Sequence, residues 1–319
     1  PARRLNSGSL VQLGQGARAR RIWTAETDRT SAVGESVCGD KELTRSLLRA
    51  AGVPVPEGRA VADPADAREA ARELGWPVVV KPRDANHGRG VFIGVRSEAE
   101  LERAFGAAAA EGSCVVVERC AAGDEHRLLV VGDRLVAAAR GSPAHVVGDG
   151  ASTVRQLIAA QLDSDPRRGP GDDTPLSLVE LDEPTLLELE RQGHGPETVP
   201  ACGERLLVQR NGNLSADVTD RVHPETAAQA VLAARVVGLD VAGVDLVAAD
   251  ASVPLEQQGG VVVEVNAGPG LQMHLKPAEG EPRPVGEAIV ENIIPAGEDG
   301  RVPVVCVTGT NGKTTVSRL

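Results

Sequence analysis

Val261-Val262-Val263-Glu264-Val265-Asn266-Ala267-Gly268-Pro269-Gly270 is the stretch that decides the fold of this chain. Its valines predict a buried β-strand, and its Gly-Pro-Gly end predicts a loop directly after the strand. Glu264 and Asn266 are two residues apart, so their side chains belong to one face of that strand. Because a carboxylate in an apolar run costs free energy without a partner, we expect one nearby. Asp245, inside the apolar stretch 243–247, is the candidate on a neighbouring strand.

Asp245, Glu264 and Asn266 form a candidate metal site. Oxygen ligands that converge from two strands suit Mg²⁺, which keeps water molecules and takes its remaining ligands from phosphates. The alternative is that the three polar residues simply end their strands. The cost of an unpartnered carboxylate among valines favours the metal.

The loop after this strand is a candidate substrate site. The backbone N–H groups of Gly268 and Gly270 suit a carboxylate substrate beside the metal, and a plain turn explains the two glycines equally well. His274 lies just beyond the loop and is included among the candidate substrate contacts. Like the other isolated histidines, it lacks the spacing of a metal ligand.

A second apolar strand ends in Lys81 and is followed by the glycine-rich segment Asn86-His87-Gly88-Arg89-Gly90. This order suits ATP, because the lysine reaches the α- and β-phosphates while the segment, including His87, Gly88, Arg89 and Gly90, covers the γ-phosphate. Such a segment is expected to be a mobile lid. Taken alone, the pattern also fits an ordinary solvated loop.

Glu118 follows three valines, and Arg127 opens the next expected strand. From a hinge position, Glu118 suits hydrogen bonds to the adenine amine or a ribose hydroxyl, and Arg127 suits a phosphate. The competing interpretation is a surface hairpin with satisfied charges. These two residues and Lys81 are nonetheless the candidates for nucleotide binding and catalysis.

The last residues, Cys306 to Leu319, contain a phosphate-loop pattern. The valines of 302–307 predict a buried strand, and Gly309 to Thr314 predict the turn. Gly309 and Gly312 let backbone N–H groups approach phosphate oxygens, Lys313 adds a charge, and Thr314 suits Mg²⁺. Gly-Thr-Asn-Gly-Lys-Thr-Thr resembles the loop of Mur ligases, which join amino acids to carboxylates using ATP. We therefore expect 299–319 to be the truncated start of a Mur-ligase-like domain.

Composition limits the function classes. The 319 residues have a formal net charge of −11 and a pI near 5.1, which argues against a general nucleic-acid binder. Five scattered cysteines without a C-x-x-C pair indicate neither a zinc site nor a disulfide framework. No signal peptide or membrane-length apolar run is recognised, so we expect a cytoplasmic protein.

Alternating helix and strand signals without a repeat predict an α/β (α+β) domain. Asp40 and Asp63 are expected helix N-caps, and Ser97 with Glu100 an expected capping box. Residues 1–38 show little periodicity and are expected to be the end of an upstream domain with a linker. The main domain is expected over 39–298.

The order of these motifs resembles ATP-grasp ligases, and several longer stretches narrow the resemblance to the cyanophycin synthetase family. These stretches are Leu10 to Gly14, Asp40-Lys41-Glu42, Ala51 to Pro56, Pro143 to Gly150 and Val263 to Gly270. The resemblance implies an ATP-grasp fold, with two lobes clasping ATP between antiparallel and mixed sheets. It also implies that Lys41 contacts the nucleotide and that Asn213 and Ser215 lie beside the substrate.

The implied reaction is ATP- and Mg²⁺-dependent polymer synthesis by a carbon–nitrogen ligase. The terminal carboxylate of a peptide (cyanophycin) primer becomes an acyl phosphate, and the amine of aspartate attacks it. Arginine addition is implied to need the missing Mur-like domain, and a homo-oligomer is expected. Two alternatives stay open: a ligase that joins a single amino acid to a small or peptide acceptor, and a non-catalytic ATP-binding module.

Overall fold

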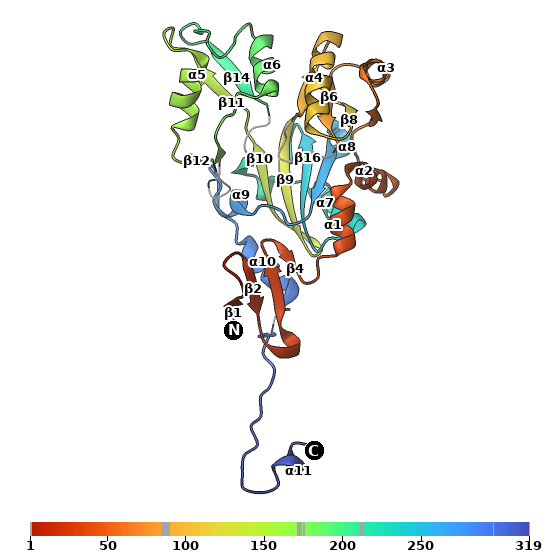
Figure 1. Ribbon diagram of the computed structural model, residues 1–319, viewed down its shortest axis with the longest axis vertical. Coiled ribbons are helices and arrows are strands. Elements are labelled where there is room, and N and C mark those ends of the chain that lie inside the picture. The colour runs from red at the N-terminus through yellow and green to blue at the C-terminus, as the bar shows by residue number, and fades with distance from the viewer. Residues whose placement is uncertain are drawn as a thin grey trace.

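A five-stranded antiparallel sheet lies at the centre of the molecule, in the order β15-β10-β9-β16-β17 (Figure 1). The computed structural model describes residues 2–83, 90–170, 174, 176–210, 214–295 and 297–318, with residues 214 and 215 described by their backbone only. The sheet consists of β9 Asp124–Val131, β10 Arg134–Gly141, β15 Leu214–Asp217, β16 Val241–Ala248 and β17 Val261–Asn266. The apolar stretch around Asp245 and the one around Glu264 are therefore both strands, as expected from the sequence.

The two faces of the central sheet are covered differently. Helices α2 Lys41–Ala50 and α7 Pro224–Val237 pack on one face, where Leu128, Val244 and Leu246 are buried. Helix α10 Val285–Ile293 packs on the opposite face, over Leu129, Val131, Ala137 and Val241 at one end of the sheet. The rest of that second face has no apolar cover from α10, and the site described below lies there.

Strand β17 contains a bulge. Glu264 pairs with Asp245, but Val262 already pairs with Leu246, so Val263 is an extra residue in the ladder. Val262 is 1% exposed in the same core as Leu246, whereas Val263 is 37% exposed. The bulge thus reverses the side-chain alternation within one short strand.

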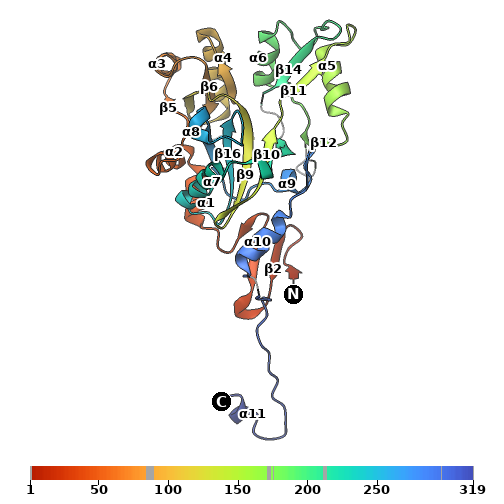
Figure 2. The same ribbon diagram turned by 180° about the vertical axis from the view of Figure 1, so that it is seen from behind.

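Two smaller lobes lie above one end of the central sheet (Figures 1 and 2). The first lobe, residues 58–119, is a four-stranded antiparallel sheet in the order β5-β8-β6-β7 with two helices. Its elements are β5 Gly58–Val61, α3 Pro64–Leu74, β6 Val78–Pro82, β7 Phe92–Val95, α4 Glu98–Glu111 and β8 Val115–Arg119.

The second lobe, residues 144–210, is built around the antiparallel pair β11 and β14. Helix α6 covers this pair and carries Leu189 into the lobe's own core. The described elements are β11 Ala144–Val147, α5 Val154–Leu157, the π-helix η2 Ile158–Asp163, β12 Arg168–Gly169, β13 Leu176–Ser177, α6 Glu183–Arg191 and β14 Arg205–Gln209. The two short strands β12 and β13 pair in parallel.

The helix caps expected from the sequence are largely confirmed. The carboxylates of Asp40 and Asp63 accept hydrogen bonds from the first turns of α2 and α3. Ser97 caps α4, but the Glu100 carboxylate accepts from the N–H of Arg96 rather than of Ser97, so the capping box is incomplete.

Residues 2–39 are more ordered than a linker. They form a four-stranded antiparallel sheet followed by a helix: β1 Ala2–Arg4, β2 Leu10–Leu13, β3 Arg20–Trp23, β4 Glu26–Thr27 and α1 Ala32–Gly39, with the 3-10 turn η1 Gly16–Arg18. Ala25 is buried against the core under α10. The low periodicity of this segment reflects its short strands.

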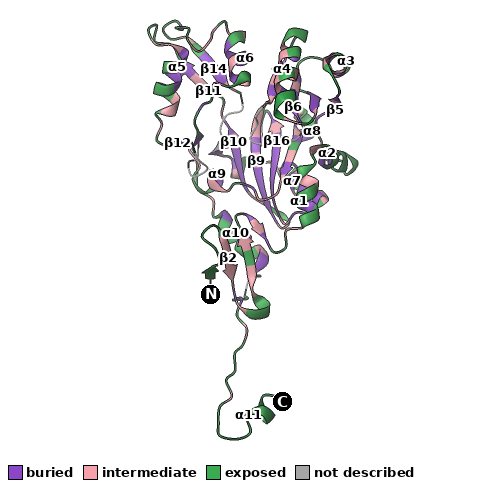
Figure 3. Ribbon diagram, viewed as in Figure 1, coloured by how far each residue is buried: buried purple, intermediate pink, exposed green. Residues whose placement is uncertain are grey.

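The expected buried strand within 302–307 is wrong. Val304 and Val305 are 80% and 85% exposed, and the tail extends away from the body as an irregular segment (Figure 3). It ends in the one-turn helix α11 Lys313–Val316. An apolar strand forms only when a neighbouring strand pairs with it and another layer covers it, and the described chain supplies neither here. No described helix has the length and apolar character needed to cross a bilayer.

Candidate functional site

The polar face of the central sheet brings together side chains from three strands. Arg127 pairs with Asp245, and Asp245 pairs with Glu264. Glu125 and Asn266 lie two residues from these positions, so all five share one face, opposite α7. The register of β16 and β17 thus places the side chains of Asp245, Glu264 and Asn266 on one face of the sheet, as expected from the sequence.

Asp245 is the centre of this group, with its side chain 7% exposed. Arg127 donates two parallel hydrogen bonds to the carboxylate, from Nε to Oδ1 and from Nη2 to Oδ2, the latter at 2.7 Å. The Nδ2 of Asn266 donates to Oδ2 at 2.9 Å. A bidentate arginine and an amide thus supply the partners that a carboxylate in a valine-rich strand requires.

Burial sets the electrostatics of the group. It raises the pKa of Asp245, while the Arg127 charge and hydrogen bonds oppose the rise and Glu264 adds to it. Burial also works against the Arg127 charge, but the Asp245 carboxylate outweighs it and the pKa of Arg127 is raised. The pair is therefore held as an ion pair in a water-poor setting.

Helix α2 brings cations to this face. The Nζ of Lys41 lies 3.4 Å from Oε1 of Glu264. One turn further along the same helix face, Nη1 of Arg45 lies 2.5 Å from Oε1 of Glu118, which belongs to the first lobe. The helix therefore joins the central sheet to the first lobe through two cations at i and i+4.

Glu118 is the focus of a second charge cluster, and its side chain is only 6% exposed. The Nζ of Lys81 lies 2.8 Å from Oε2, so the carboxylate is held between Lys81 on β6 and Arg45 on α2. The surface-hairpin interpretation of Glu118 is wrong. Arg45 was missed, because an arginine within a helix carries no sequence signal beyond its spacing from Lys41.

The glycine loop after β17 lies over the polar face. A Cβ built on Gly243 would be 2.8 Å from Cβ of Pro269 and 3.2 Å from Cδ of Arg127, so only glycine lets both lie across β16. Gly268 has φ +54° and lies beside the Glu26 carboxylate, while a Cβ on Gly270 would meet only Cε of Met273, at 3.9 Å. The loop therefore borders Arg127.

His274, on α9 Gln272–Leu275, is 2% exposed. Within the described residues its Nε2 has no hydrogen-bond partner. Burial, followed by the Arg127 charge, lowers the pKa of this imidazole to about 4. His274 is therefore neutral near pH 7 and has an unused polar atom on the Arg127 side of the loop.

Glu125 is a further member of the polar face that sequence reasoning missed. Its i, i+2 relation to Arg127 on a continuous strand is the signal that would have identified it, but the segment had been interpreted as a possible hairpin. Burial, with the charges of Asp245 and Glu264, raises the pKa of Glu125 to about 7, against the lowering effect of Arg127.

The raised pKa of Glu125 gives a pH prediction. The pKa of the Glu125 carboxyl is about 7 in the folded protein and near 4.5 in the unfolded chain. Below about pH 4.5 the carboxyl is protonated in both states and does not affect the free energy of unfolding. As the pH rises from there through 7, the charged form destabilises the folded state by an increasing amount. Glu125→Gln should therefore raise the free energy of unfolding by about 2 kcal/mol at pH 8, and the gain should vanish near pH 4.5. Urea unfolding at several pH values measures it, with exposed Glu256→Gln as control; a gain independent of pH would contradict the assignment.

The donor set on this face fits Mg²⁺. Two carboxylates and an amide oxygen lie on one face, and Mg²⁺ needs few protein ligands because waters and phosphates complete its octahedron. Among the described residues, no group of three or more His, Cys, Asp or Glu side chains is placed to hold a metal ion. Metal binding by Asp245, Glu264 and Asn266 stays a prediction.

Several candidates lie elsewhere. His87, Gly88, Arg89 and Asn213, and the side chain of Ser215, are outside the described residues. Gly90 is described two residues before β7, with φ +67°. In the exposed tail, Gly309, Gly312, Lys313 and Thr314 are remote from the polar face (Figure 1). Lys313 Nζ donates to the carbonyl oxygens of Gly309 and Thr310.

Comparison with known families identifies related proteins. The model of the ATP-grasp domain matches residues 46–133. The chain is 43% identical over 325 residues to cyanophycin synthetase of Nostoc sp. (strain PCC 7120 / SAG 25.82 / UTEX 2576), and 42% identical to that of Trichormus variabilis (strain ATCC 29413 / PCC 7937). Each match covers 100% of this chain and 36% of the relative, so the chain spans about a third of those proteins.

A solved structure extends the likeness to three dimensions. The crystal structure of a bifunctional glutathione synthetase from Pasteurella multocida superposes with a TM-score of 0.61 at 28% sequence identity. The superposition covers 92% of this chain and 41% of that one. The expected α/β (α+β) ATP-grasp fold is confirmed, but the four- and five-stranded sheets of the described chain are antiparallel throughout rather than mixed.

Proposed function

Because this chain has the ATP-grasp fold and is homologous along its whole length to part of the cyanophycin synthetases, we propose that it is an ATP-dependent carbon–nitrogen ligase. It activates the terminal carboxylate of a peptide primer and joins aspartate to it. The observation that carries the proposal is the line of cations along α2, β6 and β9 facing paired carboxylates between the first lobe and the central sheet.

The charge cluster around Glu118 and the one around Asp245 contact different parts of ATP. Lys81 and Lys41 neutralise the phosphates, and Glu118 accepts hydrogen bonds from the adenine amine or the ribose. Arg127, oriented by its two hydrogen bonds to Asp245, presents its charge where the γ-phosphoryl group moves. These roles require the lysines to exchange their carboxylate partners for phosphate oxygens, which are better acceptors for them.

The chemistry has two displacements. A carboxylate oxygen of the primer attacks the γ-phosphorus, the bond to the β-phosphate oxygen breaks, and ADP leaves with the electron pair. The neutral amine of aspartate then attacks the acyl carbon, phosphate leaves, and the amine proton passes to phosphate or solvent. The N–H groups of Gly268 and Gly270, with His274, Asn213 and Ser215, are assigned to the acceptor.

Asp245, Glu264 and Asn266 would hold Mg²⁺, which would supply charge neutralisation at the phosphates. The protein's own part is to hold two carboxylates and an amide on one rigid sheet face, with Asp245 fixed by Arg127. A rigid strand pair positions ligands more accurately than a loop does.

Calorimetry tests the nucleotide site. Titration of the 319-residue chain should reveal one ATP site that depends on Mg²⁺. Lys81→Met should weaken ATP binding about tenfold or more, because a buried cation is lost from the phosphate site. Lys276→Met, at an exposed lysine, is the control. Two sites, or one that ignores Mg²⁺, would overturn the assignment.

The acceptor is tested with a longer protein that includes any downstream domain. ADP release with aspartate should depend on a cyanophycin primer. The alternative, ligation of a single amino acid to a small acceptor, is favoured by the structural likeness to the glutathione synthetase. In that case, small peptides would replace the primer.

A further inference from the structure

Helix α6 of the second lobe faces β7 and α4 of the first lobe. Figures 1 and 2 both place α6 beside α4. Within the described residues no sheet joins the two lobes, because β11 pairs with β14 in one and β5 to β8 pair only with each other in the other. The lobes are therefore held together here by side chains.

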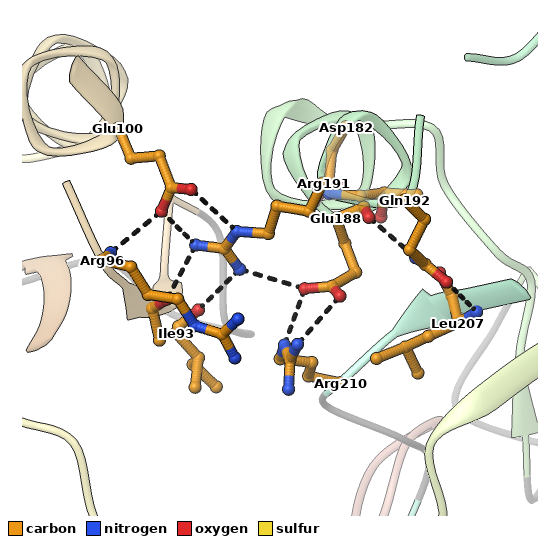
Figure 4. Close-up of polar contacts among 11 residues, drawn as sticks. Ile93, Arg96, Glu100, Asp182, Glu188, Arg191, Gln192, Leu207 and Arg210 are labelled. Atoms are coloured by element: carbon orange, nitrogen blue, oxygen red, sulfur yellow. Dashed lines mark hydrogen bonds and ion pairs between the residues drawn. The ribbon is translucent and has the colours of Figure 1, made fainter. Parts of the chain in front are cut away.

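Arg191 makes the principal connection (Figure 4). Its guanidinium donates to Glu100 of α4 from Nη2 at 2.6 Å and to the carbonyl oxygens of Ile93 and Gly94 of β7 at 3.2 and 2.9 Å. On its own helix it donates to Glu188 at 3.0 Å. Its side chain is only 13% exposed, so bulk solvent screens these contacts weakly.

The connection continues to the end of β14. Arg210, the residue after that strand, donates to Glu188 from Nε at 2.6 Å and from Nη2 at 2.9 Å. Glu188 is 7% exposed and so is a shared acceptor for Arg191 and Arg210. A continuous polar chain thus runs from α4 through α6 to β14.

Two further contacts support the joint. Leu187 of α6 is buried within the apolar core of the first lobe rather than that of its own. Arg103 of α4 pairs with Glu183 at 2.8 Å and with Glu190, both on α6. A cavity of about 170 Å³ between the lobes, lined on one side by Phe92 and on the other by Arg210, leaves the rest of the interface loosely filled.

We propose that α6 is a latch, centred on Arg191 and Glu188, through which the second lobe moves with the first lobe over the central sheet. A single guanidinium that satisfies two carbonyl oxygens and a carboxylate on one lobe, and a carboxylate on the other, fixes their relative orientation. Lobe closure over a nucleotide, which rests on the proposed function, is then transmitted through Glu188 and Arg210 to β14.

Hydrogen–deuterium exchange with mass spectrometry tests the latch without nucleotide. In Arg191→Met, backbone amides of β7 and α6 should exchange about tenfold faster than in the wild type, while those of α7 stay unchanged. Glu100→Ala removes the partner on the other lobe and should produce the same pattern. Arg155→Met, which breaks the exposed pair with Glu197 inside the second lobe, is the matched control. Unchanged exchange in both latch variants would overturn the proposal.

Adding ATP and Mg²⁺ tests the coupling. In the wild type, peptides of the first lobe and of α6 and β14 should gain protection at the same ATP concentration. In Arg191→Met, protection should be limited to the first lobe. Protection limited to the first lobe in the wild type would refute the latch. Absence of protection everywhere would count against the proposed function, and the nucleotide-free comparison would still decide the latch.

Discussion

Glu264→Ala should abolish ATP-dependent ligation, by about 10³-fold or more, while leaving the protein folded. The physical reason is that a carboxylate ligand is lost from the assigned metal site. The Glu264 side chain is 31% exposed, and its ion pair with Lys41 spans 3.4 Å. Partly exposed pairs contribute about 0–1 kcal/mol to stability, so unfolding should barely change. ADP release and thermal unfolding measure the two quantities.

The control for this variant is Glu256→Ala, which removes an exposed carboxylate on α8 Leu255–Gln258. It should retain full activity. In the Glu264 variant, the Mg²⁺ concentration for half-maximal ATP binding should also rise. Retained turnover with unchanged Mg²⁺ dependence would remove Glu264 from the site.

Arg127→Met should be the most destabilising of the proposed substitutions, at about 3–5 kcal/mol, because it leaves the buried Asp245 carboxylate without its bidentate partner. Activity should be lost as well. Urea unfolding at pH 7 gives the stability change.

A double variant separates the two roles of Arg127. In Arg127→Met with Asp245→Leu, both charges are gone and apolar groups of similar volume replace them, so most of the lost stability should return. Activity should not return, since a phosphate-binding cation and a metal ligand are both missing. If the double variant unfolds as readily as Arg127→Met alone, the single loss of stability does not come from the unpaired carboxylate.

The sequence predicted the features that depend on local chemistry. Helix caps at Asp40 and Asp63 and the strands around Asp245 and Glu264 are where they were expected. Each follows from a side chain acting on backbone groups a few residues away, or from an apolar run that only a strand accommodates.

What the sequence did not predict depends on contacts between distant segments. Arg45 and Glu118 are far apart along the chain and meet only because α2 packs beside the first lobe. The strand expected within 302–307 failed for the converse reason, because Val304 and Val305 are exposed and no strand in the described chain pairs with this segment. The α6 network likewise depends on how two separately folded lobes face each other.

The bulge at Val263 has a consequence for redesign of this protein. The extra residue lets the side chain of Val262 point into the core under α7, while that of Glu264, two positions later, points to the polar face. Deleting Val263 would remove the bulge and leave Val262, Glu264, Val265 and Asn266 in regular alternation, with the two valines still in the core and the two polar residues still on the polar face. Deleting Val265 instead would place Glu264 and Asn266 on opposite faces. Val263 is therefore the position in this strand at which a change of length leaves the site intact.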